Sequence, residues 1–401
     1  MPDPVPTTRP LRIGVAGLGR AFTLMLPTFV ADDRVQLVAG ADPLSAARDQ
    51  FTRDFGGPVF ERVEALCERS DVDVVYIATP HKHHAEHAAV AFAHGKHVLL
   101  EKPMAITLEA CTSMIDAARA AGRHLVVGHS HSFDRPIART RELIESGRYG
   151  DVRMITALNF TDFLYRPRRP EELSTHDGGG VVFSQGSHQV DIVRLLGGGN
   201  VSRVRASTGR WDPARPTEGA YAALLQFDDG TFAQITYSGY AHYDSDELMD
   251  GIGELGQSKS PDDYGAARRR LELVHDAAEE ARLKAARNYG GAMYKAPGAS
   301  APAAWNHFGF LVACCDRADL RPTARGIGIY ADRERSFEAL PPPAVPRVEV
   351  IDELVRAVLD DVAPLHDGEW SRATLEACLA ILESARTSAD VTLRHQRPLR
   401  S

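Results

Sequence analysis

The feature that most constrains the fold is an alternation of short apolar runs with helix-forming stretches over the first 130 residues. The apolar runs are LRIGVAG (11–17), VQLVAGAD (35–42), VDVVYIATP (72–80), HVLLEKP (97–103) and HLVVGH (124–129). Their length and near absence of charge are typical of parallel strands covered on both faces. The intervening stretches are long enough for crossover helices. This rhythm predicts an α/β domain with a doubly wound parallel sheet over residues 1–130.

Size and charge narrow the class of protein. With 401 residues, a second domain is expected over 131–401. A net charge of −8 argues against a general nucleic-acid binder, which needs basic surface. No apolar run is long enough to span a bilayer, and the proline-rich start, MPDPVPTTRP, lacks the apolar core of a signal peptide. We therefore expect a cytoplasmic protein without a membrane partner.

A glycine turn between the first strand and first helix suggests a dinucleotide site. Gly17 permits a tight turn, and Gly19 lets backbone N–H groups approach a pyrophosphate at the helix N-terminus. Phe22 replaces the third glycine of the GxGxxG pattern, so the match is partial. Asp42 ends the second strand, where an acid can bind ribose hydroxyls and would repel a 2′-phosphate. NAD is therefore predicted, although Arg48 keeps NADP open. The predicted contacts in this region are Gly17, Gly19, Arg20, Ala21, Phe22 and Asp42.

The third and fourth strands end in polar residues that should lie beside the same crevice. Ligands of doubly wound sheets bind off the carboxyl ends of the strands. Pro103 restricts Lys102 to an extended backbone and permits a cis bond, which would fix the direction of the ammonium group. The alternative is that Glu101 and Lys102 form only a capping ion pair. The predicted cofactor contacts at these tips are Thr79, Pro80, His84, Glu101, Lys102 and Pro103.

The second half has a different pattern. Strand-like runs at 151–162, 201–211, 220–227 and 231–240 follow one another with few helices between them, and FDDG (227–230) is a hairpin signal. We expect an open, mostly antiparallel sheet, with one face free to pair with a second subunit in a homodimer or homotetramer. A charged, helix-prone segment at about 245–302 is expected to be an insertion with solvated helices.

Five segments in the same order resemble the Gfo/Idh/MocA family of nicotinamide-dependent oxidoreductases. They are GVAGLGR, ATPHKHHAEHA, GKHVLLEKPMA, GGGVVFSQGSHQVDIVRLLGG and HDGEWSRATLEACLAILESA, and they are spread over most of the chain. The resemblance implies a Rossmann domain followed by a larger α/β domain with an open sheet. It also implies that Lys102 lies between nicotinamide and substrate.

The catalytic segment departs from the family pattern at one position. A helix starting near Val181 would place Ser184, His188 and Asp191 on one face. The family usually has aspartate at the position of Ser184, paired with the histidine four residues later. Without that carboxylate, His188 should be less basic. We predict Lys102, His188 and Ser184 as the catalytic residues and leave open whether Lys102 or His188 is the base. The alternative for His188 is a helix histidine satisfied by a backbone carbonyl.

Four further stretches resemble the branch of the family that oxidises phthalate cis-4,5-dihydrodiol to 4,5-dihydroxyphthalate. They are GHSHSFDRPI, NFTDFLYRPRRPEEL, WDPARPTEGAYAA and YSGYAHYDSDE, and that branch shares the serine-for-aspartate change. A dicarboxylate needs cationic partners, which the YRPRRP loop offers unless its arginines form only a surface ion-pair patch. The predicted substrate-binding residues are Arg166, Arg168, Arg169, His129, His131, Gln185, His188 and Tyr240.

The same residues suggest three other interpretations. The histidines at 81, 83, 84, 129 and 131 raise the possibility of a metal site, but no paired carboxylates accompany them in the sequence, so no metal is predicted. A sugar or cyclitol dehydrogenase of the same family would favour Asp or Asn around His188. A non-catalytic nicotinamide sensor is disfavoured because both Lys102 and His188 are present.

Overall fold

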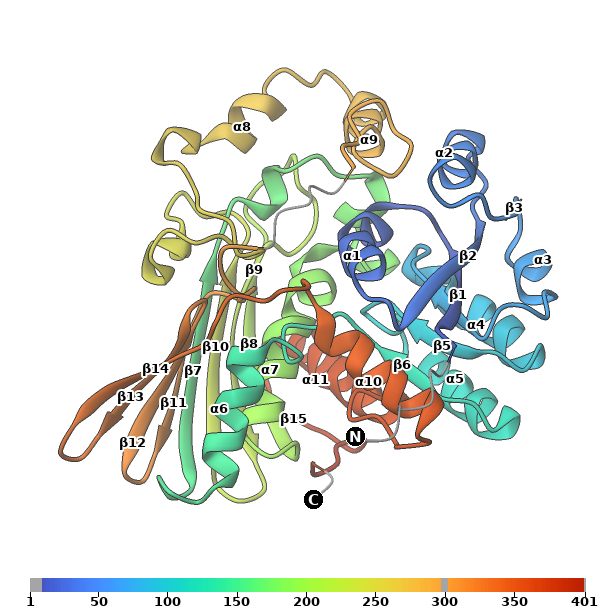
Figure 1. The fold of residues 1–401 in the computed structure, drawn as a ribbon. Coiled ribbons are helices and arrows are strands. Elements are labelled where there is room, and N and C mark those ends of the chain that lie inside the picture. The colour runs from blue at the N-terminus through green and yellow to red at the C-terminus, as the bar shows by residue number, and fades with distance from the viewer. Residues whose placement is uncertain (1–8, 297–301, 400–401) are drawn as a thin grey trace.

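The computed structural model describes residues 9–296 and 302–399 and consists of two sheets with helices around them (Figure 1). The proline-rich start discussed above lies almost wholly outside the described residues. Within the described chain, no helix is both long and apolar enough to cross a membrane.

The first sheet has six parallel strands in the order β3-β2-β1-β4-β5-β6. Its strands are β1 (Leu11–Ala16), β2 (Val35–Ala41), β3 (Val59–Phe60), β4 (Val74–Ile77), β5 (His97–Leu100) and β6 (Leu125–Val127). The helices between them are α1 (Arg20–Ala31), α2 (Ser45–Phe55), α3 (Val63–Cys67), α4 (His84–Ala93) and α5 (Leu108–Ala121). The predicted doubly wound sheet is confirmed, with an additional short edge strand, β3. The strand order reverses between β1 and β4, so a ligand crevice is expected at the carboxyl ends of these strands.

The second sheet has nine strands in the order β14-β13-β12-β11-β7-β10-β9-β8-β15. They are β7 (Val152–Phe160), β8 (Val201–Gly209), β9 (Ala220–Phe227), β10 (Phe232–Ser238), β11 (Phe310–Cys315), β12 (Ala318–Thr323), β13 (Gly326–Ala331), β14 (Arg335–Ala339) and β15 (Val391–Thr392). Among these pairs only β7 and β10 run parallel, so the predicted mostly antiparallel sheet is confirmed. The predicted hairpin at FDDG joins β9 to β10, with the Phe227 N–H donating to the Thr231 carbonyl at 2.8 Å.

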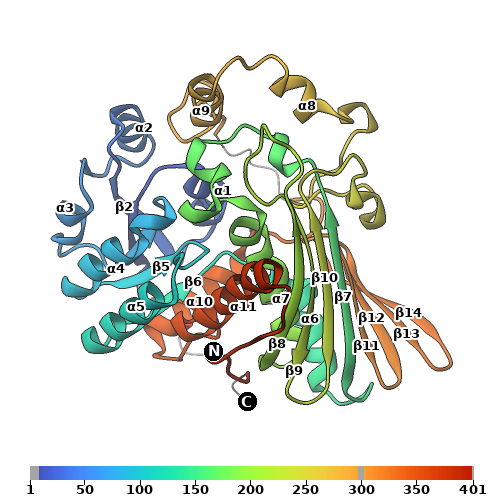
Figure 2. The same ribbon diagram turned by 180° about the vertical axis from the view of Figure 1, so that it is seen from behind.

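Helices cover one face of the second sheet and also join it to the first. The helices on this face are α6 (Arg135–Glu145), α7 (Ser187–Leu196) and α11 (Gly368–Thr387). The opposite face carries no helix in either view (Figures 1 and 2), and pairing through it with a second subunit stays a prediction. Helix α10 (Val348–Leu359) buries Val350, Ile351 and Leu354 in the core of the first domain. The C-terminal part of the chain therefore fixes the two domains against each other.

The charged insertion crosses the top of the molecule. Its helices are α8 (Ala266–Leu271) and α9 (Ala277–Ala285). In both views α8 lies on the side of the second sheet and α9 on the side of α1 and α2. The insertion is helical, as expected, but it spans both domains rather than extending from one of them.

Candidate active site

The glycine turn has the shape that a dinucleotide requires. Gly17 has φ +92°, and a Cβ there would lie 2.8 Å from the backbone of Ala78 and Thr79, so only glycine fits between β1 and β4. Around Gly19 a Cβ would meet no atom within 4 Å, which leaves open space over the N-terminus of α1. The Asp42 carboxylate accepts hydrogen bonds from the N–H groups of Leu18 and Leu44, both at 2.8 Å, and so ties the turn to the end of β2. The turn and the acid therefore fit NAD.

Other residues predicted to bind the cofactor shape the crevice from within the protein. Phe22 is fully buried and packs in the core under α1, so its side chain positions the helix. His84 is also buried and lies within 2.9–3.2 Å of the backbone carbonyls of Thr79, Pro103 and Met104. It therefore holds the tips of β4 and β5 together rather than offering a free imidazole.

Lys102 follows β5, and its side chain extends toward the second domain. The Lys102–Pro103 peptide bond is cis, the isomer that the sequence permits. The Lys102 ammonium donates to the carbonyl of Ser184 at 2.8 Å, whereas the Glu101 carboxylate accepts from the Tyr76 hydroxyl at 2.5 Å. No Glu101–Lys102 ion pair is present in the described structure, so these two residues do not form the capping ion pair that was the alternative. Burial lowers the pKa of Lys102 to about 8, even though Glu101 and Glu254 oppose this change.

A helix begins near Val181 as predicted, but the part that carries Ser184 is a π-helical turn and not a regular α-helix. Val182–Gly186 forms a π-helical turn before α7 begins at Ser187. The Ser184 hydroxyl donates to the Gly180 carbonyl, and the Ser184 carbonyl faces Lys102. The wider turn therefore presents a backbone acceptor to the lysine. Turns of this type often occur at functional sites.

His188 is buried in α7 and has a defined tautomer. Its Nδ1 accepts a long hydrogen bond, 3.4 Å, from the His131 backbone N–H. Nε2 therefore carries the proton in the neutral ring and is a donor. Burial, followed by the charges of Lys102 and His131, keeps the pKa of His188 well below its usual value. The alternative in which a backbone carbonyl satisfies this histidine is not observed.

A cluster of two histidines and two acids lies beside His188. Asp134 contacts His129 Nε2 at 3.0 Å and His131 Nδ1 at 2.6 Å, and Glu254 contacts His131 Nε2 at 3.3 Å. Although burial opposes it, attraction to Asp134 and Glu254 raises the pKa of His131. The His131 imidazolium is thus held between two carboxylates, with its ring centroid 4.6 Å from that of His188.

The three arginines of the YRPRRP loop have different surroundings. Arg169 lies within 3.5 Å of Glu171 and Glu172, so it matches the surface ion-pair alternative. Arg168 stacks on Phe163, with its guanidinium carbon 3.6 Å from the ring centroid, and its side chain is 10% exposed.

Arg166 is the loop arginine that combines exposure with proximity to the histidine cluster. Its side chain is 43% exposed, and Nε donates to Asp162 at 3.1 Å. Burial lowers the pKa of Arg166, but attraction to Asp162 and Glu254 outweighs this effect, so the pKa is raised. Among the three, Arg166 is therefore the candidate for an anionic group of the substrate.

Two other residues predicted to bind substrate face interior partners. The Tyr240 hydroxyl donates to the Thr217 carbonyl at 3.1 Å, and its ring packs on Trp211. Tyr240 therefore supports the loop rather than offering a free hydroxyl. Gln185 is buried within the π-helical turn.

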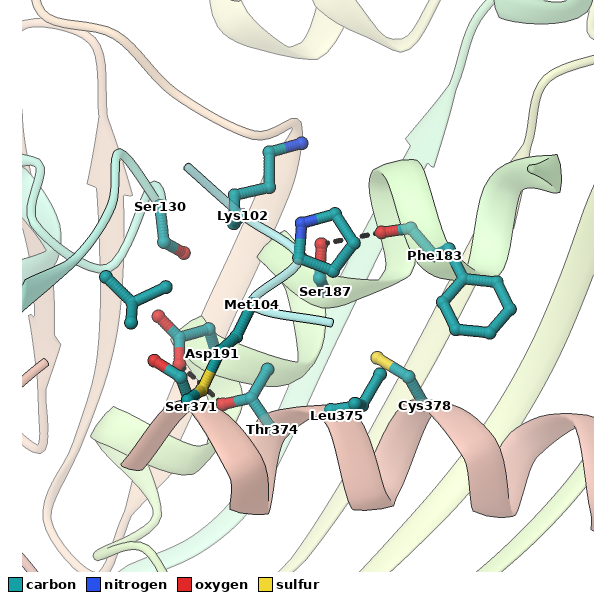
Figure 3. A pocket seen from close by; sticks show the side chains of 12 residues that line it. Lys102, Met104, Ser130, Phe183, Ser187, Asp191, Ser371, Thr374, Leu375 and Cys378 are labelled. Carbon is teal, nitrogen blue, oxygen red and sulfur yellow. Dashed lines mark hydrogen bonds between the residues drawn. The ribbon is translucent and has the colours of Figure 1, made fainter. Parts of the chain in front are cut away.

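A pocket lies beneath Lys102, where the first domain meets α7 and α11 (Figure 3). The Lys102 ammonium points away from the end of the pocket that Asp191 and Thr374 line. Neither His131, His188 nor Glu254 lines it. The Asp191 carboxylate accepts hydrogen bonds from Trp370, Thr374 and Ser132, which fixes α7 to α11. The pocket is therefore a seam between the domains that the histidine cluster does not line.

Sequence reasoning missed Asp134, Glu254 and Phe308. Asp134 had a signal, because it lies three residues after His131 in the HSHSFDRP stretch. Glu254 lies in a segment that composition marked as solvated surface. Phe308 packs on His131 and His188, with centroids 5.1 and 4.9 Å away, and nothing in its sequence neighbourhood indicated this contact.

Comparison with known proteins places the chain among oxidoreductases. A model described as an oxidoreductase family with an NAD-binding Rossmann fold matches residues 11–129, and the Gfo/Idh/MocA C-terminal domain matches residues 137–258. The 1-carboxy-3-chloro-3,4-dihydroxycyclohexa-1,5-diene dehydrogenase of Comamonas testosteroni is 52% identical over 94% of this chain and 95% of its own.

Two further proteins are similar to this chain. A dTDP-3,4-didehydro-2,6-dideoxy-α-D-glucose 3-reductase of Streptomyces violaceoruber is 35% identical over 56% of this chain and 65% of its own. A crystal structure from Bordetella bronchiseptica RB50, of a protein provisionally assigned as a dehydrogenase, has a TM-score of 0.90 and 39% identity over 96% of this chain and 100% of its own.

Proposed function

The chain belongs to the Gfo/Idh/MocA family of NAD-binding oxidoreductases, and on that premise we propose that it oxidises the cis-dihydrodiol of an aromatic carboxylate. The full-length similarity to the Comamonas testosteroni dehydrogenase supports this substrate class. The single observation that carries the proposal is the set of side chains around His188, which combines one available arginine with an aromatic surface.

The aromatic surface suits a flat ring. Phe308 stacks on Tyr237, with centroids 6.1 Å apart and planes 12° apart, and also packs on His188. A cyclohexadiene can pack against such a surface, whereas a polyol would leave its hydroxyl groups without hydrogen-bond partners there. Arg166 can form a charge-assisted hydrogen bond with one carboxylate.

The reaction needs a base for one hydroxyl proton. A neutral Lys102 amine accepts that proton, which is feasible near neutral pH because its pKa is about 8. His188 donates a hydrogen bond from Nε2 to the same oxygen and stabilises the alkoxide charge as the proton leaves. Bound NAD supplies the acceptor for the hydride from the carbinol carbon, leaving a hydroxyketone that tautomerises to a catechol. The Gly17–Gly19 turn, Asp42 and Thr79 would hold the cofactor.

Among carboxylated dihydrodiols, we propose a monocarboxylate as the preferred substrate. Arg166 is the loop arginine that is attracted to Glu254 of the histidine cluster, and its side chain is 43% exposed, compared with 10% for Arg168. A second candidate is phthalate cis-4,5-dihydrodiol, the substrate predicted from the sequence. One observation favours it: the buried Nε of Arg168 has no hydrogen-bond partner among the described residues, so it could serve a second carboxylate after a small shift.

Turnover with a substrate panel tests the proposal. NADH formation is followed at 340 nm with the cis-dihydrodiols of benzoate and phthalate, with myo-inositol and with glucose. We expect kcat/KM for a carboxylated dihydrodiol to exceed that for either polyol by about 100-fold or more. Equal or better oxidation of a polyol would favour the sugar or cyclitol alternative, and NADH binding without turnover of any diol would favour the sensor.

A further inference from the structure

The insertion, whose described residues 245–296 we call the strap, is fixed firmly to the second domain. Glu280 of α9 accepts hydrogen bonds from Arg215 Nη1 at 2.8 Å and from the Arg168 backbone N–H at 2.7 Å. The side chains of Arg215 and Glu280 are both buried. Lys284, one turn later, pairs with Glu172. These contacts hold α9 against the second domain, because Glu280 and Lys284 each have a specific charged partner there.

The strap is also fixed to the first domain. The Tyr289 ring meets Phe22 of α1 edge to face, with centroids 5.0 Å apart, and its hydroxyl donates to Asp54 of α2 at 2.5 Å. Gly290 has φ +72°, and a Cβ there would lie 2.6 Å from the Ala46 carbonyl oxygen, so the backbone itself packs on α2. Between Glu280 and Tyr289 the chain therefore passes from one domain to the other, above α1 in Figure 1.

Arg20 and Arg287 belong to segments that meet near the start of α1, and the segment of Arg347 contacts the same helix further along. Arg20 is the first residue of α1, two residues before Phe22, and Arg287 lies two residues before Tyr289 in the strap. Arg347 follows Pro346, whose carbonyl accepts a hydrogen bond from Thr28 of α1 at 2.6 Å. Burial lowers the pKa of Arg20, and the charges of Arg287 and Arg347 lower it further, so both of these groups repel the Arg20 guanidinium.

Arg20 and Arg287 have no ion-pair partner among the described residues, whereas Arg347 is attracted to the buried Glu101. In the described residues, no carboxylate oxygen lies within 4.0 Å of a guanidinium nitrogen of Arg20, Arg287 or Arg347. Repulsion of Arg20 by these two cationic neighbours disfavours the arrangement, and a bound anion would attract all three groups. An anion would lie in the open space over Gly19, at the N-terminus of α1.

We propose that Arg287 of the strap, together with Arg20 and Arg347, binds the pyrophosphate of the dinucleotide. The insertion is then a cofactor clamp that bridges the domains, and Arg287 is a cofactor-binding residue supplied from outside the Rossmann domain. The proposal depends on NAD binding by this family and not on which diol is oxidised.

Equilibrium binding by Arg287→Ala tests the clamp. NADH binding is measured by fluorescence titration, and the binding of ADP-ribose and AMP is measured by competition with NADH. The control variant is Arg282→Ala on α9, because Arg282 is an exposed arginine of the same strap. We expect Arg287→Ala to lower the affinity for NADH and ADP-ribose roughly tenfold, because a charged hydrogen bond to the pyrophosphate is lost. The affinity for AMP should fall much less. Arg282→Ala should bind all three ligands as the wild type does.

Several results would overturn the clamp. These are an unchanged NADH affinity in Arg287→Ala, an equal loss in Arg282→Ala, or a loss confined to NADPH, which would place Arg287 at a 2′-phosphate. Arg287→Glu provides a second variant and should bind NADH more weakly than Arg287→Ala at low salt, with the difference shrinking as salt rises. Because no diol is present, failure of the proposed substrate would leave these binding results intact.

Discussion

The two sides of the cleft are assembled in different ways. On the cofactor side, Gly17, Asp42, Thr79 and Lys102 follow β1, β2, β4 and β5, four neighbouring strands of one parallel sheet. The substrate side is assembled from loops, a π-helical turn and an insertion, which lie far apart in the chain. A parallel sheet aligns the ends of its strands wherever it forms, whereas the substrate side depends on how separate segments pack. Variation of substrate within one family is therefore easiest on the second side.

The largest effect is expected where the two sides meet. Lys102→Ala removes the proposed base from the cofactor side, and we expect kcat/KM to fall about 1,000-fold because general base catalysis contributes on this scale. NADH affinity, measured by fluorescence titration, should change little, since the glycine turn and Asp42 remain. A variant that retains activity within about tenfold would show that Lys102 is not the base.

On the substrate side, Arg166→Ala should raise KM for a carboxylated dihydrodiol by about 10-fold or more, because a charged hydrogen bond to the carboxylate is lost. Arg169→Ala is the matched control, since its guanidinium is paired with Glu171 and Glu172. Steady-state kinetics with the cis-dihydrodiol of benzene tests whether the loss depends on the substrate carboxylate. This substrate has no carboxylate, so Arg166→Ala and Arg169→Ala should have similar KM values for it. An equal rise in KM for the carboxylated dihydrodiol in both variants would show that Arg166 has no special role in carboxylate binding.

A smaller effect tests the electrostatic link between the two sides. In the wild type, kcat/KM should rise with pH through about 8, because protonated Lys102 cannot accept the substrate proton. Glu254 stabilises the ammonium form and raises the pKa of Lys102. Glu254→Gln should therefore lower that pKa and move the rising limb of the pH–rate profile to lower pH. A limb that stays in place or moves to higher pH would contradict this link.

The smallest effect concerns the attachment of the strap. Tyr289→Phe removes the hydrogen bond to Asp54 but keeps the ring on Phe22, so the free energy of unfolding should fall by about 1 kcal/mol. Tyr289→Ala should cost more, because it also removes buried aromatic surface. Denaturant unfolding of both variants checks this order. If the two variants were equally stable, the ring contact would contribute nothing to stability.

Much of the cofactor side was predictable from the sequence. The positions of Gly17, Asp42 and Lys102 at strand ends follow from the alternation of strands and helices, and the structure has the parallel sheet that this alternation predicts. Buried residues were harder to interpret. Phe22 and His84 were read as cofactor contacts, but sequence position alone does not show that their side chains face the protein interior.

The substrate side was less predictable because its geometry departs from regular elements. The π-helical turn at Val182–Gly186 directs the Ser184 carbonyl to Lys102, and a helical wheel drawn at 3.6 residues per turn cannot show this. The charge pattern of the insertion was typical of a solvated helix, yet Glu254 contacts His131 across 123 residues of sequence. A local pattern carries no information about a partner at that separation.

The sequence by itself determined the type of each domain, the order of the strands along the chain and the lysine at the cleft, because hydrophobic period and turn residues act locally. Only the tertiary structure decided the protonation and partners of that lysine and of His188, which depend on burial and on charges brought in by distant segments. The contacts of the strap were decided there as well, since they join two domains and exist only once both have folded.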